Sequence, residues 1–268
     1  MSEKLQQDSL WIRRRIIELA HNAGANGSHT GGSLSLVEIL CCLYSHCDIA
    51  SDGTPERNRL ILSKGHGALA LYATLERYGK LSKEDTDTFE TNGTKLFAHS
   101  SRIVDKGLEF AGGSLSLGLS FSVGVALAAK SHGYDNQIYV IVGDGECNEG
   151  LVWESLMSIS NYGLNNMTII VDNNDLQSDG FGSDVMNSKP LTDKFSAFGF
   201  DVHEIDGHNI DEITQALNTK HTNPKAIIAH TTKGKGVATM ENDPTWHHGI
   251  VNDAVYNEAM LNLNEGTA

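Results

Sequence analysis

The chain has 268 residues, and its 34 acidic against 20 basic side chains give a formal net charge of −14. This surplus of negative charge repels a polyphosphate backbone, so it argues against nucleic-acid binding. No stretch approaches the ~20 apolar residues of a membrane helix, and no apolar signal core follows the polar segment MSEKLQQDSLWIRRR. We therefore expect a cytoplasmic globular protein, with residues 1–268 forming one α/β domain.

The first third of the chain is predicted to be helical, over residues 4–21, 33–47 and 67–79. Three of the four cysteines, Cys41, Cys42 and Cys47, fall in the second of these helices, and Cys147 stands alone. No CxxC pair is present, so we expect reduced, buried thiols rather than a metal cluster.

From residue 137 onward, short apolar runs alternate with helical segments. The predicted strands are 137–142, 167–172, 200–205 and 225–230, and the predicted helices are 149–163, 191–198, 210–220 and 254–263. This alternation indicates a parallel sheet flanked by helices. Ligands of such sheets bind at the carboxyl ends of the strands, so the loops after residues 142, 172 and 230 are the places to expect a site.

Two of these loops carry metal-ligand chemistry. The first strand is followed by GDGECNEG (143–150), and the second ends in DNNDLQ (172–177). Asp144 and Asn174 would lie at the ends of neighbouring strands, and both offer the hard oxygens that Mg²⁺ prefers. Either loop alone is as well explained by a turn or a helix cap. The two together favour a metal site.

Four histidines lie in loops, three of them next to glycine, where imidazole and backbone can both reach a ligand. They are His29, His66, His99 and His248. Imidazole titrates near neutral pH, so it can move protons or donate to a phosphate. A loop histidine without function remains the alternative for each. A further segment, 112–120, opens a helix of small residues (115–130) that permits close packing and could present its N-terminus to a ligand.

Five segments in order resemble the transketolases, over about residues 10–250. They are LSKGHGALALY (62–72), GLEFAGGSLSLGLS (107–120), GDGECNEGLVWES (143–155), VDNNDLQSDG (171–180) and TTKGKGVATMENDPTWHHG (231–249). The resemblance implies the thiamine-diphosphate-binding fold, specifically its diphosphate-binding domain. It also implies the transfer of a two-carbon ketol unit from a ketose to an aldose, with the cofactor as electron sink.

The resemblance also assigns roles to residues. The metal, Mg²⁺ or its substitutes Ca²⁺ and Mn²⁺, would be held by Asp144, Asn174 and the main-chain carbonyl of Leu176. His29 and His99 would face the sugar, and His66 and His248 would lie beside the diphosphate and the reacting centre. Other residues expected at the cofactor are Gly113, Leu115, Gly143, Gly145, Glu146 and Glu149, the last between paired cofactor sites.

Transketolase-like enzymes need a second, pyrimidine-binding domain, and no segment of this chain resembles it. We therefore expect the partner to be a separate pyrimidine-binding subunit, in a heterotetramer around two shared sites, acting on sugars or sugar phosphates. Near the expected substrate side the chain departs from the family: Ser100 replaces a proline, the usual SLGQG reads SLSLG (114–118), and the region around Thr30 lacks its proline. The donor sugar therefore stays open.

Three other interpretations compete with this one. The alpha subunit of a 2-oxo acid dehydrogenase is also thiamine-dependent and split, but the segments around His66 and His248 argue against it. Deoxyxylulose phosphate synthase would bring further domains that are not seen. A non-catalytic subunit that binds a partner or the cofactor without turnover is the rival of a different class, and the complete set of site residues argues against it.

Overall fold

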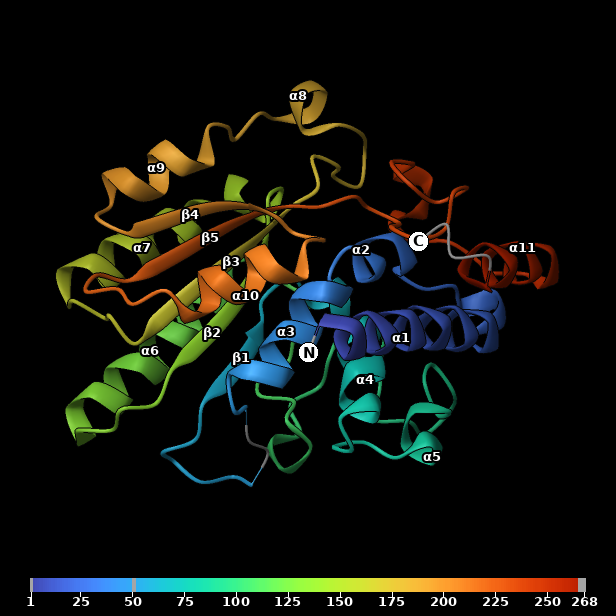
Figure 1. Cartoon of the computed structure of the whole chain (residues 1–268), viewed down its shortest axis with the longest axis horizontal. Helices are drawn as coiled ribbons and strands as arrows, with labels where there is room; N and C mark the ends of the chain where they lie inside the picture. Colours follow the sequence, from blue (N-terminus) through green and yellow to red (C-terminus); the bar gives the residue numbers. More distant parts are fainter. Residues whose placement is uncertain (1, 50–51, 265–268) are drawn as a thin grey trace.

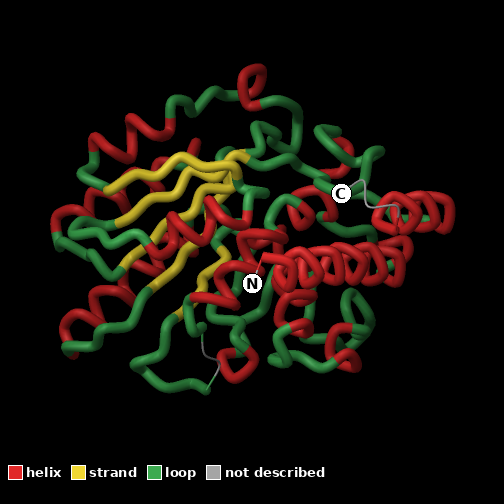
Figure 2. The backbone as a smooth tube through the Cα atoms, in the orientation of Figure 1, coloured by secondary structure: helices red, strands yellow, loops and turns green. Residues whose placement is uncertain are grey.

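The computed structural model describes residues 2–49 and 52–264. In this part of the chain five parallel strands form one sheet in the order β1-β2-β3-β5-β4 (Figures 1 and 2). The strands are β1 (Arg59–Leu62), β2 (Ile138–Gly143), β3 (Met167–Asn173), β4 (Asp201–Asp206) and β5 (Lys225–His230). Because all five are parallel, their carboxyl ends meet at one edge.

Helices cover both faces of the sheet and extend beyond one end of it (Figure 1). The larger helices are α1 (Ser2–Asn22), α3 (Val37–His46), α4 (Ala68–Arg77), α6 (Leu117–His132), α7 (Gly150–Asn161), α9 (Leu191–Ala197), α10 (Ile210–Asn218) and α11 (Asp253–Asn264). Shorter ones are α2 (Thr30–Leu34), α5 (Lys83–Thr86) and α8 (Gly182–Val185). None of the helices in the described residues is long and apolar enough to cross a membrane.

Alternate residues of the central strands point into two separate hydrophobic cores. In β2, Tyr139 and Ile141 pack with α1, α3, α4 and α10, whereas Val140 and Val142 pack with α6, α7 and α9. Burial of both faces explains why the strand reads as a continuous apolar run, as is usual in parallel sheets. The sheet is thus a rigid middle layer that fixes the loops at its carboxyl edge.

The predicted architecture is confirmed, with one strand missed. The four predicted strands and all the predicted helices are present, with ends shifted by a few residues, and β2 and β3 are neighbours as expected. The missed strand is β1, the run RLIL, which is too short to stand out beside the glycine-rich segment that follows it. It is held by its register with β2, from Arg59 opposite Ile138 to Leu62 opposite Ile141. All four cysteines are free and buried, as expected.

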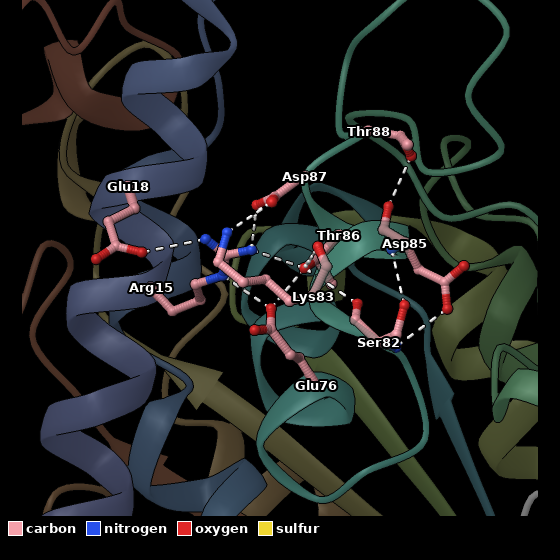
Figure 3. A network of polar contacts seen from close by, with 9 residues as sticks. All are labelled: Arg15, Glu18, Glu76, Ser82, Lys83, Asp85, Thr86, Asp87 and Thr88. Carbon is pink, nitrogen blue, oxygen red and sulfur yellow. Dashed lines mark hydrogen bonds and ion pairs between the residues drawn. The ribbon is translucent and has the colours of Figure 1, made fainter.

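A buried arginine joins α1 to the helices that lead to the His99 loop. Arg15 is 3% exposed, and its guanidinium contacts Glu76 of α4 at 2.8 Å and Thr86 of α5 at 2.9 Å, with Asp87 and Glu18 as further partners (Figure 3). Buried guanidinium groups need such complete pairing, because an unpaired charge in the interior is strongly unfavourable. This network therefore fixes α5 against the rest of the helical layer.

A second buried ion network lies behind the loop that follows β5. Arg13 donates to both carboxylate oxygens of Glu38, and also to the carbonyl of Lys235 at 3.0 Å. His208 contacts Glu38 through Nδ1 at 2.9 Å and accepts the amide proton of Thr232 at Nε2, at 2.8 Å. Because Nε2 accepts, Nδ1 must carry the proton and donate to the carboxylate. The network therefore holds the backbone of the loop at both Thr232 and Lys235.

We predict that Glu38→Gln destabilises the chain by about 3–5 kcal/mol, because it leaves the Arg13 charge buried without a carboxylate. Burial acts to raise the pKa of Glu38, but Arg13 outweighs it and lowers the pKa to about 2. This contribution to stability is present above the unfolded pKa of 4.5 and is lost as the pH falls from there toward 2. Urea unfolding between pH 7 and pH 3 measures both effects. Equal losses of stability with acid in wild type and variant would contradict the assignment.

Candidate active site

A cavity of about 310 Å³ opens at the carboxyl edge of the sheet, where the loops after β1, β2, β3 and β5 converge. Most of the predicted site residues line it. They are His29, His66, His99, Gly113, Leu115, Gly143, Asp144, Gly145, Glu146, Asn174 and Leu176. Strands 137–142 and 167–172 therefore do bring their loops to a common site, together with segments from the helical layer.

The floor of the cavity contains a fully buried ion pair. Asp172, at the end of β3, is 0% exposed and pairs with Lys64, which is 1% exposed. Ser35 also donates to this carboxylate, at 2.7 Å, and Thr231 donates to its other oxygen. Burial acts to raise the pKa of Asp172, but Lys64 and these donors outweigh it, so the pKa lies below the ordinary value. Asp172 is therefore a charged anchor that joins β1, β3 and β5.

Asp144 is a buried carboxylate without a cation of its own. It accepts the amide protons of Gly145 at 2.9 Å and Asp175 at 2.6 Å, and it is 8% exposed. Burial, and then the neighbouring charge of Asp172, raise its pKa to about 6. Asp175 has a left-handed φ of 61°, a conformation that costs a non-glycine residue roughly 1–2 kcal/mol. The loop thus accepts strain in a place where it directs an amide to the carboxylate.

Asn174 and Leu176 complete an oxygen-rich corner beside Asp144. The side-chain oxygen of Asn174 accepts the amide proton of Leu176 at 3.1 Å, and its nitrogen donates to Asp172 at 3.1 Å. The carbonyl of Leu176 accepts from the ammonium of Lys233, at 3.1 Å.

This donor set fits a hard divalent cation, since it combines a carboxylate, an amide oxygen and a carbonyl oxygen. The raised pKa of Asp144 shows that its negative charge is under-compensated by the protein, which is what a bound cation would correct. Clusters of three or more His, Cys, Asp or Glu side chains suited to a metal are absent from the described residues. A metal at this corner would therefore depend on neutral oxygen donors and on ligand oxygens.

Five histidine rings gather at the mouth of the cavity. The centroid of the His29 ring lies 4.9 Å from that of His99, 4.7 Å from that of His248, 5.5 Å from that of His247 and 5.9 Å from that of His66. Nδ1 of His29 is buried without a hydrogen-bond partner among the described residues. This cluster brings together all four predicted histidines and a fifth, His247.

Burial sets the protonation of these rings. Burial and then the nearby His99 lower the pKa of His29 to about 3, and burial and then Lys233 lower that of His247 to about 4. Burial also lowers the pKa of His66 well below its ordinary value, and that of His99 below it. These rings are therefore neutral at pH 7, and each can accept a hydrogen bond or a proton at one ring nitrogen.

Glu146 supports the cavity from beneath the start of α6. It is 2% exposed and accepts from the hydroxyl of Ser63 and from the amides of Ser116 at 2.7 Å and Gly143 at 3.0 Å. Ser116 adopts a left-handed φ of 69° to direct its amide to this carboxylate. Burial raises the pKa of Glu146. The three donors of Glu146 come from three separate loops, so it holds together the segments that carry Lys64, Leu115 and Asp144.

We predict that Ser116→Gly increases the free energy of unfolding by about 0.5–1 kcal/mol. Glycine adopts a positive φ without the cost that serine has there, although part of the gain is offset by greater freedom of the unfolded chain. Urea denaturation measures the change, with Ser114→Gly, two residues earlier and without a positive φ, as control. A stability equal to that of the control variant would show that the left-handed conformation is not strained.

Several residues of the site were missed from the sequence, and two predicted ones lie elsewhere. Lys64, Lys233 and His247 line the cavity. Both lysines sit in glycine-bearing motifs that the sequence singled out, which was the available signal. Glu149 is exposed, where it begins α7, and lies outside the cavity lining. His248 also lies outside the lining, although its ring packs on His29.

A parallel sheet with acidic and amide-bearing loops at its carboxyl edge defines a cofactor-binding α/β domain. Residues 11–259 match the family described as "Transketolase, thiamine diphosphate binding domain". The chain is 39% identical to one of the named subunits of the apulose-4-phosphate transketolase of Phocaeicola vulgatus, over 98% of this chain and 95% of that protein. It is 38% identical to the SqwG subunit of the 6-deoxy-6-sulfo-D-fructose transketolase of a Clostridium species, over 98% of both chains.

Among solved structures, the transketolase of Campylobacter jejuni superposes with a TM-score of 0.85 at 30% identity, over 97% of this chain. The match covers 42% of that transketolase, so the chain spans about two fifths of its length. The chain therefore belongs to the transketolase family, and it corresponds to the family's thiamine-diphosphate-binding domain. The predicted fold and family are confirmed.

Proposed function

We propose that this chain is the diphosphate- and metal-binding subunit of a two-chain transketolase, which transfers a two-carbon ketol unit from a ketose or ketose phosphate to an aldose. The observation that carries the proposal is the under-compensated carboxylate of Asp144. It lies beside Asn174 and the Leu176 carbonyl in one cavity, in a chain of this family. Thiamine diphosphate, when bound, supplies the electron sink for breaking and forming the carbon–carbon bond.

In this proposal Mg²⁺, or Ca²⁺ or Mn²⁺ in its place, is held by Asp144, Asn174 and the carbonyl of Leu176. The ammonium groups of Lys64 and Lys233 counter the negative charge of the diphosphate, which otherwise adds to that of the buried carboxylates. Gly113 and Gly145 present backbone at the cavity, and no side chain of their own obstructs the approach of a large ligand there.

The histidine cluster is assigned to the substrate. His29 and His99 would contact the sugar hydroxyls and move protons, while His66 and His248 would lie nearer the diphosphate and the reacting centre. Their neutral rings suit this role, because a neutral imidazole can take a proton from a hydroxyl and return it. The position of His247 in the lining adds a fifth ring to this set.

We further propose that a separate chain supplies the pyrimidine-binding domain, in a cytoplasmic heterotetramer with two shared sites. The names of the relatives support this, since two of them are transketolase subunits of nearly the same length as this chain. Those names also suggest donors to test: apulose 4-phosphate and 6-deoxy-6-sulfo-D-fructose.

Calorimetric titration of the purified chain with thiamine diphosphate tests this proposal, with and without Mg²⁺ and with the partner chain. We expect tight binding only when metal and partner are both present, and ketol transfer only by the two-chain complex. Full transfer by this chain alone would overturn the split-enzyme proposal. Cofactor binding by the complex without transfer from any ketose would instead favour a non-catalytic subunit.

A further inference from the structure

One residue near the histidine cluster has a strained backbone. Glu90 has a φ of 57°, in the left-handed region that a non-glycine residue enters at a cost of roughly 1–2 kcal/mol. It follows α5 and precedes the loop that carries His99. Backbone strain of this kind persists only where surrounding contacts impose it, and it is often found next to functional sites. The contacts of Glu90 show what the strain achieves.

Glu90 joins two loops through three hydrogen bonds. Its carboxylate accepts the amide proton of Ala98 at 2.5 Å, and its own amide donates to the carbonyl of Leu96 at 3.2 Å. Its carbonyl accepts from the side chain of Asn26 at 3.0 Å. Ala98 immediately precedes His99, and Asn26 lies three residues before His29. A single residue thus connects the chain just ahead of both histidines.

The two histidines meet where these loops meet. The ring centroids of His29 and His99 are 4.9 Å apart, and both rings line the cavity. Elsewhere the His99 loop is held by the hydroxyl of Tyr72, which donates to the carbonyl of Phe97 at 2.9 Å. That bond joins the loop to α4, not to the segment with His29. The link between the two histidine segments through Glu90 is therefore separate from the anchoring of the loop itself.

We propose that Glu90 is a positioning residue that clamps the loops of His29 and His99 together at the sugar side of the cavity. The assignment rests on the proposed function for the role of the two histidines in donor binding. The clamp itself rests on the hydrogen bonds. Glu90 forms no ion pair with any described residue, so its carboxylate is available to the Ala98 amide. The strain at Glu90 is then the cost of directing its amide, carbonyl and carboxylate to two loops at once.

Three substitutions at this position separate the clamp from stability. Glu90→Gly removes the carboxylate and also relieves the left-handed strain, whereas Glu90→Ala removes the carboxylate and keeps the strain. Glu90→Gln keeps a side-chain oxygen that can accept from Ala98. Glu84→Ala, which removes an exposed carboxylate in α5, is the matched control.

The first measurement is the NMR spectrum of the full chain labelled at histidine Cε1, with His29 and His99 assigned by His→Gln variants. We expect both resonances to move in Glu90→Gly and Glu90→Ala, and to stay near the wild-type positions in Glu90→Gln and Glu84→Ala. The melting temperature of Glu90→Gly should equal or exceed that of Glu90→Ala. Unchanged histidine resonances in the Gly and Ala variants would overturn the clamp, whether or not the chain proves to belong to a two-chain transketolase.

The second measurement uses the complex with its partner and the ketose, among apulose 4-phosphate, 6-deoxy-6-sulfo-D-fructose and fructose 6-phosphate, that wild type turns over. We expect the KM for that donor to rise about five- to tenfold in Glu90→Gly, as for the loss of one positioning hydrogen bond, with cofactor affinity unchanged. Glu90→Gln should restore the KM. A Gly variant with wild-type KM and kcat would overturn the positioning role. If no ketose is turned over by wild type, the proposed function fails and the NMR result still decides the clamp.

Discussion

Replacing Asp144 with alanine is expected to abolish Mg²⁺-dependent binding of thiamine diphosphate while the chain stays folded. The carboxylate is the one charged oxygen donor in the proposed metal set, beside the amide of Asn174 and the carbonyl of Leu176. Losing it should weaken cofactor binding more than about 100-fold, beyond the effect seen when only an outer-shell partner is removed. Asp144 lies in a loop past the end of β2, so its removal leaves both hydrophobic cores intact.

The charge of Asp144 also predicts the stability of the variant. Its pKa is raised to about 6 in the folded chain from 3.8, so the ionised carboxylate works against folding at pH 7. This penalty is absent below the unfolded pKa and develops as the pH rises through about 6. Alanine removes the penalty but also the two hydrogen bonds to Gly145 and Asp175, so little net change is expected without cofactor.

Calorimetry with thiamine diphosphate and Mg²⁺, in the presence of the partner chain, measures the affinity of this variant, and urea denaturation measures its stability. Asp184→Ala, which removes an exposed carboxylate in α8, is the control and should bind as wild type does. An Asp144→Ala chain that still binds the cofactor with wild-type affinity would show that the metal assignment is wrong. An unfolded variant would show that the carboxylate is structural.

The sequence predicted the elements of the sheet well because their signals are local. Strands such as β2 and β3 are continuous β-branched runs, buried on both faces, and turn residues mark their ends. Strand β1 was missed because its four residues acquire their identity from pairing with β2, more than 70 positions further on. Long-range pairing of so short a segment leaves little pattern in its own sequence.

The candidate site was predicted at the level of loops but not of single side chains. The spacing of Asp144 and Asn174 correctly indicated that two strand ends meet. Nothing in the pair His247-His248 tells which ring enters the cavity, because a turn of the backbone by one residue exchanges them. In the structure His247 lines the cavity, while His248 packs beside His29.

The buried lysines escaped notice for a different physical reason. Lysine is usually exposed, and only the fold shows that Lys64 and Lys233 are 1% and 2% exposed. Lys64 is explained by its pairing with Asp172. Lys233 has no carboxylate partner among the described residues, so a buried ammonium faces the cavity without a balancing anion.

We expect Lys233→Met to weaken the binding of thiamine diphosphate by about 10–100-fold, the loss expected for a hydrogen bond to a charged group of about 1.5–3 kcal/mol. The ammonium now donates to the carbonyls of Leu176 at 3.1 Å and Gln177 at 3.4 Å, and to Nδ1 of His247 at 3.0 Å. A cation at the Leu176 carbonyl would repel it, which leaves it free to turn to a diphosphate oxygen.

The same variant should fold at least as stably as wild type without cofactor. Burial, and then the neighbouring Lys64, lower the pKa of Lys233 to about 8, so its charge opposes folding at pH 7, and methionine of similar length removes that cost. Lys235→Met is the control: Lys235 lies in the same loop, is only partly buried and has its own partner in Glu241 at 3.6 Å. Calorimetry and thermal unfolding of both variants separate the two effects. Weaker cofactor binding in Lys233→Met alone, without loss of stability, would mean that the chain keeps a buried charge for its ligand and not for its fold, whereas equal affinities in the two variants would contradict this role.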